Sequence, residues 1–309
     1  MHANHRRAPA GENPRHRATG PVQRRNPGGR FDYTTVGHVT VDVMADGSRR
    51  PGGTAFYSAL QASRLGMRTL ILTRGEPGEI EQLLDPFRSE LELEIQPAEH
   101  TTTLLTSGSG AARSQRLLAW AGPIEGEPEL DSSILHLAPV ARETPRRWTG
   151  RAGFVGLTPQ GLARRWPGAG GRMSLAPIEA GALPERCDAI VISEVERAAG
   201  AELLECAHAA GALVAVTAGH RPTTILMPGG ETLLAPTPAR EMGGEDIGAG
   251  DVFAAALFIA LHEGRRPSDA AAFAAAAAAL RIGAAATSGI AGRGEIEARA
   301  RAHMRELPG

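Results

Sequence analysis

The chain has 309 residues, of which 42% are hydrophobic and 4% aromatic, and its formal net charge is −1 at pH 7. This hydrophobic content is sufficient for a buried core, and the near-neutral charge and scarce aromatics argue against a nucleic-acid partner. All 33 basic residues are arginine. The lack of lysine excludes a Walker-A loop, a protein-kinase strand lysine and Schiff-base chemistry.

The sequence predicts one domain, residues 31–309, behind a disordered tail. Residues 1–30 contain seven arginines and have no hydrophobic period, so an idle tail is favoured over a leader that docks a partner. No stretch reaches the roughly 18 apolar residues of a membrane span. Cys187 and Cys206 lack metal-ligand spacing and are expected to be buried free thiols. These features predict a cytoplasmic protein with no membrane partner.

In chain order, a strand-like pattern covers residues 33–43 and ends near the turn at Asp46-Gly47. A helix over residues 54–65, closed by Gly66, and an apolar strand over residues 69–73 complete a βαβ unit. The remaining predicted elements are strands at 133–137, 153–157, 189–193 and 213–217, antiparallel stretches at 101–106 and 224–234, and helices at 251–262 and 268–280, the last capped by Ser268. The pattern predicts an α/β fold with a mostly parallel sheet between helices.

A glycine turn precedes the helix expected from Asp251. Gly248 and Gly250 permit close backbone approach to a ligand, and the following helix directs its free N–H groups at the turn. Such a turn suits an anion. A carboxylate at the same place would repel phosphate unless it accepted a proton from an attacking hydroxyl. The segment therefore predicts a small-molecule kinase.

The run Gly248-Ala249-Gly250-Asp251-x-Phe253 resembles the C-terminal signature of the ribokinase, or PfkB, family of carbohydrate kinases. The resemblance implies a three-layer α/β/α sandwich with a β lid, and ATP and Mg²⁺ as cofactors. It also implies that Asp251 is the catalytic base and that the amides of Gly248, Ala249 and Gly250 form an anion hole. Glu245 and Asp246 replace the usual Asp-Thr pair, which leaves open whether a monovalent cation is needed.

The acceptor side resembles the same family. Gly52-Gly53, before the helix over residues 54–65, is similar to its N-terminal signature, with Tyr57 in place of the usual Asn. Paired glycines would let a sugar-like ring lie against the backbone. Asp42, expected at the end of the first strand, would accept bonds from two vicinal hydroxyls. A plain turn role for Asp42 is the alternative.

Weaker resemblances to motifs of the same family imply the residues of the phosphoryl-donor site. Glu196, in Ser193-x-x-Glu196, stands where the family carries an Asn-x-x-Glu motif linked with magnesium and phosphate. A solvated surface glutamate is an equally good interpretation. Other residues are expected near the nucleotide: Thr217, Gly219 and Arg221 beside the phosphates or ribose, and Arg281 and Gly283 beside the adenine.

Only residues 44–51 separate Val43 from Gly52, where ribokinases insert a longer β-stranded lid. The reduced lid resembles a branch that includes inositol kinases, so a cyclic polyol or sugar is the first expected acceptor and a nucleoside the second. Replaced residues such as Tyr57, Ser193 and Pro222 keep open a catalytically weak sugar- or nucleotide-binding sensor. The sequence leaves a monomer and a homodimer equally open.

Overall fold

A computed structural model describes residues 31–108, 113–238, 245–284 and 286–306. The predicted tail, residues 1–30, lies outside the described residues.

The central sheet has nine strands, and the first seven from one edge are parallel. The last two are antiparallel and close the other edge. This confirms the mostly parallel sheet that the sequence predicts. In spatial order the strands are β5 (Glu92–Pro97), β4 (Thr69–Gly75), β1 (Phe31–Val36), β8 (Ser132–Leu137), β9 (Ala152–Leu157), β13 (Ala189–Ser193), β14 (Leu213–Ala218), β15 (Arg221–Leu226) and β16 (Thr232–Ala235).

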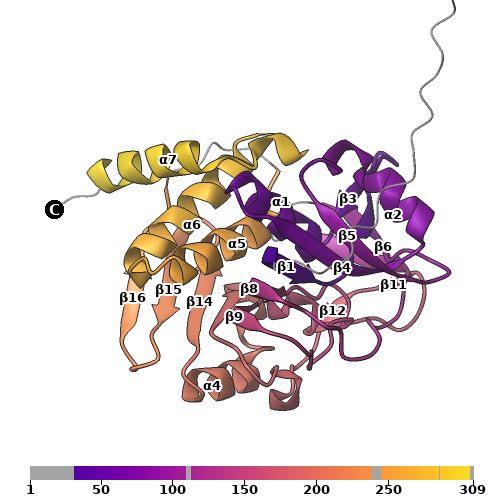
Figure 1. Ribbon diagram of the computed structural model, residues 1–309, viewed down its shortest axis with the longest axis horizontal. Helices are drawn as coiled ribbons and strands as arrows, with labels where there is room; N and C mark the ends of the chain where they lie inside the picture. Colours follow the sequence, from indigo (N-terminus) through magenta and orange to yellow (C-terminus); the bar gives the residue numbers. More distant parts are fainter. Residues whose placement is uncertain (1–30, 109–112, 239–244, 285, 307–309) are drawn as a thin grey trace, which may run out of the picture.

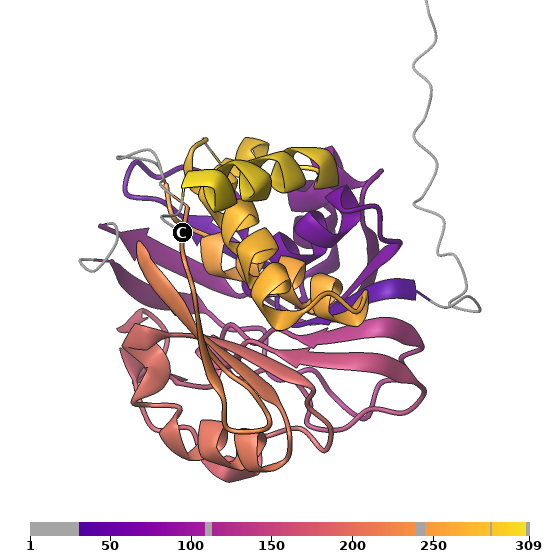
Figure 2. The same ribbon diagram turned by 90° about the vertical axis from the view of Figure 1, so that its left-hand side faces the viewer.

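Helices cover both faces of this sheet, which gives the predicted three layers (Figures 1 and 2). One face packs against α1 (Thr54–Arg64), α5 (Ala249–His262) and α6 (Pro267–Ile282), with α7 (Arg293–Glu306) outside them. The other face packs against α4 (Ala201–Ala209). Alanines on α6 allow close approach to α5, and the two helices share one core with the sheet.

Shorter elements complete the main domain: α2 (Pro77–Leu84), α3 (Glu194–Arg197) and the 3₁₀ turns Asp85–Phe87, Pro159–Gly161, Ala180–Ala182 and Ala286–Gly289. None of the helices in the described part of the chain combines the length and hydropathy that a bilayer crossing requires.

A second sheet lies over one end of the first. Its order is β11 (Gly171–Arg172), β7 (Ser114–Ala119), β6 (Thr103–Ser107), β2 (Thr40–Val43) and β3 (Arg49–Gly52). The segment between Val43 and Gly52 forms the β2–β3 hairpin, and the sheet to which it belongs has five strands.

The prediction of one strand over residues 33–43 is wrong. The pattern splits into β1 and β2, which belong to different sheets and are joined by Gly37, His38 and Val39. Asp42 consequently lies in the second sheet, opposite Arg50 on β3, and not at the end of the first strand.

Three smaller corrections concern other elements. The helix expected from Asp251 begins at Ala249, and the next begins at Pro267, so Ser268 is not its cap. Proline at the first helical position has no N–H, which removes one of the unpaired donors of the first turn. The stretch 224–234 is antiparallel, as predicted, but it divides into two strands, β15 and β16. Cys187 is half-buried and Cys206 is exposed.

Candidate active site

The predicted site residues converge at the carboxyl ends of the parallel strands. β13 ends at Ser193 and β14 at Ala218, and α5 starts above the same edge of the sheet. Open α/β sheets bind their ligands at this edge. The second sheet contributes Asp42 from above, so the site lies between the two sheets.

The glycine turn before α5 has the conformation that the sequence predicts. Gly248 has φ 80°, in the left-handed region, and a Cβ atom there would lie 2.5 Å from the Tyr57 ring. The Ala249 amide donates to the Asp246 carbonyl at 3.2 Å, so it is engaged within the turn. The Gly250 amide has no backbone partner among the described residues, and a Cβ atom on Gly250 would meet no atom within 4 Å. An amide without a partner at the start of a helix can bind an anion.

The two glycines should therefore respond differently to alanine. Gly248→Ala should lower the Tm, because a left-handed backbone costs a side-chain-bearing residue about 1–2 kcal/mol and the methyl group meets Tyr57. Gly250→Ala should leave the Tm unchanged or slightly raised, since the position is helical and open. The same variant should raise the donor KM. Calorimetry and steady-state kinetics measure both effects, and a donor KM unchanged in Gly250→Ala would contradict the anion hole.

Asp251 lies in the first turn of α5 and is half-buried. α1 holds this turn, because the Ser58 hydroxyl donates to the Asp251 carbonyl at 3.1 Å. Burial raises the pKa of the Asp251 carboxyl from 3.8 to about 6, against a hydrogen bond from Thr54 and the charge of Arg164. A carboxylate with a pKa near the working pH is suited to proton transfer.

Arg164 is the main site residue that the sequence analysis missed. It belongs to β10 (Arg164–Arg165), which pairs with β12 (Ser174–Leu175), and it is only 9% exposed. Its guanidinium donates to the Val140 carbonyl at 3.0 Å and to Gln115 Oε1 at 2.9 Å. Burial lowers its pKa, while the carboxylates of Glu196, Asp251, Asp42 and Glu143 raise it. Arg164 thus provides a positive charge that interacts with all three predicted acidic residues, Asp42, Glu196 and Asp251.

The residues predicted to contact the acceptor form one cluster. Asp42 is 6% exposed, and the Thr40 hydroxyl donates to its Oδ1 at 2.7 Å. A Cβ atom on Gly52 would lie 2.3 Å from the Asp42 carboxylate, and one on Gly53 would lie 2.3 Å from the His38 carbonyl. Gly53 also has φ 93°. The glycine pair is therefore required by close packing on Asp42 and on the β1–β2 connection.

Tyr57 is buried beneath the turn. Its ring contacts Gly248, and burial and the nearby Asp42 carboxylate raise its pKa to about 12. This position makes Tyr57 a packing partner of the turn.

Glu196 lies near the centre of the charge cluster, because its carboxylate acts on both Asp251 and Arg164. It also forms a capping box on α3, in which the Ser193 hydroxyl donates to Oε2 at 2.6 Å and the Ser193 amide to the same oxygen at 3.4 Å. The described residues contain no group of three or more metal-ligating side chains. Mg²⁺ in kinases is commonly held by one or two carboxylates together with substrate phosphates, and a single half-buried Glu196 fits that arrangement.

The residues predicted for the donor side lie at the β14–β15 connection and at the end of α6. Thr217 is opposite Ser193 in the β13–β14 register, and Gly219 makes the following turn with φ 67°. Arg221 is exposed and forms an ion pair with Glu194. Gly283 ends α6. Arg281 differs from expectation, since its side chain is completely buried and offers no surface to an adenine ring.

Two ion pairs tie the loop before α5 to the second sheet. Arg50 Nη1 lies 3.1 Å from both carboxylate oxygens of Glu245, and Arg113 pairs with Asp246. The residues that depart from the family signature are therefore the ones that contact the second sheet.

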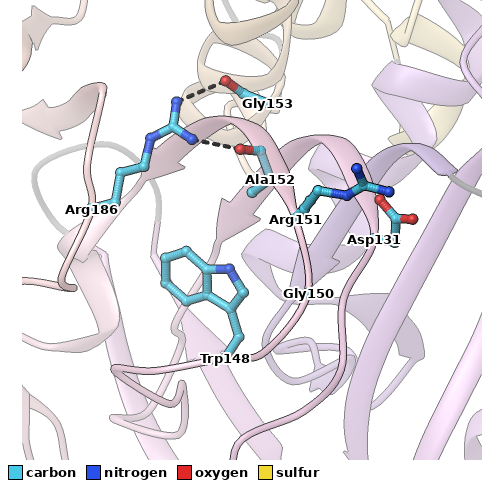
Figure 3. A pocket seen from close by; sticks show the side chains of 7 residues that line it. All are labelled: Asp131, Trp148, Gly150, Arg151, Ala152, Gly153 and Arg186. Atoms are coloured by element: carbon cyan, nitrogen blue, oxygen red, sulfur yellow. Dashed lines mark hydrogen bonds between the residues drawn. The ribbon is translucent and has the colours of Figure 1, made fainter.

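A cavity of about 500 Å³ lies elsewhere, at the amino ends of β8 and β9 (Figure 3). Among the residues that line it are Asp131, Trp148, Arg151 and Arg186. The Arg186 guanidinium donates hydrogen bonds to the carbonyls of residues 152 and 153. None of the predicted site residues lines this cavity, so it is separate from the candidate site.

One known protein family matches part of this chain. Residues 179–290 match the model of the pfkB family carbohydrate kinase. A search of the curated proteins gave no match.

Similar solved structures include a pyrophosphate-dependent kinase in the ribokinase family complexed with a pyrophosphate analog and myo-inositol (21% identity, TM-score 0.64, covering 86% of this chain and 99% of that one). Arabidopsis thaliana ribokinase complexed with ribose and ATP is 18% identical, with a TM-score of 0.66 and coverage of 88% and 99%. The Methanocaldococcus jannaschii nucleoside kinase is 17% identical, with a TM-score of 0.67 and coverage of 89% and 100%.

The structural matches extend the likeness beyond residues 179–290, because each covers 86–89% of this chain. The chain therefore has the ribokinase-like fold, and its residues 179–290 match the model of the pfkB carbohydrate kinases.

Proposed function

We propose that the chain transfers the terminal phosphoryl group of ATP to a hydroxyl of a sugar or cyclic polyol. The observation that carries this proposal is Asp251, a carboxylate with a pKa of about 6 placed directly behind a glycine turn with an unbonded amide. Asp251 orients the acceptor hydroxyl and accepts its proton late in a loose transition state. The amides of Gly248 and Gly250 bind the phosphate, while the Ala249 amide stabilises the turn.

Arg164 supplies the positive charge that the chain cannot take from lysine. Its guanidinium is fixed by two hydrogen bonds and acts on Asp251, Asp42 and Glu196 together. A fixed arginine stabilises the charge of a transferring phosphoryl group without further reorganisation. Mg²⁺, held by Glu196 and the donor phosphates, would neutralise further phosphate charge.

The donor side lies at the ends of β14 and β15, with Thr217, Gly219 and Arg221 beside the nucleotide phosphates. We place the acceptor against Asp42 and the Gly52-Gly53 pair, where a buried carboxylate can accept bonds from two hydroxyls. The bound ribose and myo-inositol of the two similar kinases support an acceptor of this size. The nucleoside kinase supports a nucleoside as second candidate.

A panel assay tests the proposal. The protein would be incubated with Mg²⁺, with ATP or pyrophosphate, and with each of several cyclic polyols, sugars and nucleosides, and phosphorylated products followed by ³¹P NMR. Pyrophosphate is included because one similar kinase depends on it. Turnover of a polyol or sugar with ATP would support the proposal. Ligand-induced rises in Tm without any product would favour a sensor instead.

Asp42→Asn should raise the acceptor KM and lower kcat/KM by about 10–100-fold, because a hydrogen bond to a charged group contributes about 1.5–3 kcal/mol. The donor KM should stay within about twofold, since Asp42 belongs to the acceptor side. Asp46→Asn is the matched control, because Asp46 is an exposed aspartate of the same hairpin. An equal effect on both substrates would contradict the assignment of Asp42 to the acceptor.

A further inference from the structure

Arg281 is an arginine without a complete set of partners. It lies in the last turn of α6 and is 0% exposed. Its Nη1 donates to the carbonyls of Glu245 and Ala284, both at 3.4 Å, and the guanidinium faces the Tyr57 side chain, while Nε and Nη2 have no hydrogen-bond partner of acceptable geometry among the described residues. A buried guanidinium that is incompletely bonded is costly. The free-energy cost of burying this guanidinium indicates that Arg281 has a role beyond packing.

The position of the guanidinium relates it to the glycine turn. Glu245, whose carbonyl accepts one of these bonds, lies in the loop just before Gly248. Ala284, whose carbonyl accepts the other, lies in the loop after α6. The guanidinium carbon lies 5.6 Å from the centre of the Tyr57 ring, and the same ring contacts Gly248. Arg281 therefore lies beneath the turn and bridges the two loops that frame it.

The nearby carboxylates are already paired with other arginines. Glu245 is bound by Arg50 through both oxygens, and Asp246 by Arg113. No ion pair joins Arg281 to an acid in the described segments of the chain. Its charge is thus available to an anion bound at the turn, in addition to the partial charge of the α5 N-terminus.

We propose that Arg281 is a positioning residue of the phosphoryl-donor site. It holds the loop before α5 and the loop after α6 together by their carbonyls, and its permanent charge favours the donor phosphates at the Gly248 and Gly250 amides. A covalently attached cation in this place also makes an added monovalent cation unnecessary. The inference rests on the proposed function only for its kinetic readout, because anion binding can be measured without turnover.

The main experiment compares Arg281→Ala with the wild-type protein by titration calorimetry with inorganic pyrophosphate. The variant should bind pyrophosphate about tenfold more weakly or worse, as expected for loss of a buried charge near a phosphate. Guanidinium ion, at a concentration that leaves the wild-type Tm unchanged, should restore most of the affinity. The control is Arg64→Ala. Arg64 also donates to carbonyls of the segment after α6, those of Thr287 and Ile290, but it is on the far end of α1.

Arg64→Ala should show no loss of pyrophosphate affinity and no rescue by guanidinium. In turnover, Arg281→Ala should raise the donor KM and leave the acceptor KM unchanged. Wild-type turnover should be equal in potassium, sodium and choline chloride at one ionic strength. Wild-type affinity in Arg281→Ala, or a loss that guanidinium does not restore, would overturn the proposal.

If Arg281→Ala does not fold, Arg281→Lys and Arg281→Met replace it. The lysine variant keeps the charge and should retain pyrophosphate affinity within about threefold, whereas the methionine variant should lose it. Equal affinities in these two variants would refute the role of the charge. Pyrophosphate binding that depends on Arg281, without transfer to any acceptor, would refute the proposed function and leave this inference standing.

Discussion

Asp251→Asn is expected to lower kcat by about 10²–10⁴-fold, the range that a positioned general base contributes. Substrate KM values should change little, because asparagine keeps the shape of the side chain but cannot accept the proton. The effect is measured by release of the spent donor in a coupled assay. The control is Asp269→Asn, an exposed aspartate on α6. Near-wild-type turnover in Asp251→Asn would remove the proposed mechanism.

The pH dependence gives an independent check on the same residue. The base must be ionised, and burial raises its pKa to about 6, so wild-type kcat/KM should be constant at higher pH and fall tenfold per unit below about pH 6. The raised pKa also means that ionisation of Asp251 destabilises the folded state as the pH rises from about 4 to 6. Asp251→Asn should therefore raise the free energy of unfolding at pH 8, on the order of 1–3 kcal/mol. No such gain should appear at pH 3, where both states are neutral.

Arg164→Met is expected to lower kcat by about 10²–10³-fold and to destabilise the protein by about 3–5 kcal/mol. The kinetic effect follows from loss of a fixed charge beside the transferring group. The stability effect follows because Asp42 and its acidic neighbours stay buried without their counter-charge. Turnover and urea unfolding measure the two effects.

The pH at which kcat/KM falls on the acid side, the acid limb of the pH profile, distinguishes a catalytic effect of Arg164→Met from an effect on folding. Arg164 lowers the pKa of Asp251, so its loss should move the limb above pH 6. Arg164→Lys keeps the charge and should retain much of the stability and the original limb. A profile that stays in place in Arg164→Met would show that the arginine does not act on Asp251.

The sequence predicts those parts of the site where a turn residue stands directly beside a helix start. Glycines that must adopt positive φ or pack against a side chain stand out beside a helix, as at Gly53 and Gly248. A strand pattern interrupted by a single glycine is less informative. Residues 33–43 form such a pattern, and Gly37 is equally compatible with a bulge inside one strand and with a change of sheet.

Arg164 as a site residue and the burial of Arg281 could not be predicted from sequence for a different reason. Arg164 lies in a two-residue strand whose pairing with β12 depends on tertiary contacts. Arg281 lies in the last turn of the alanine-rich helix α6, where a basic residue normally faces solvent and complements the helix dipole. Its burial results from the loops on either side of it, which no local pattern encodes.

The two ion pairs between the second sheet and the loop before α5 have a consequence for the order of events in turnover. Arg50 on β3 is in register with Asp42 on β2, and its partner Glu245 leads to the turn at Gly248. A displacement of the sheet that carries the acceptor residue must break these pairs or move the turn with it. Acceptor and donor affinities are then linked, and by thermodynamic reciprocity each substrate changes the affinity for the other by the same factor.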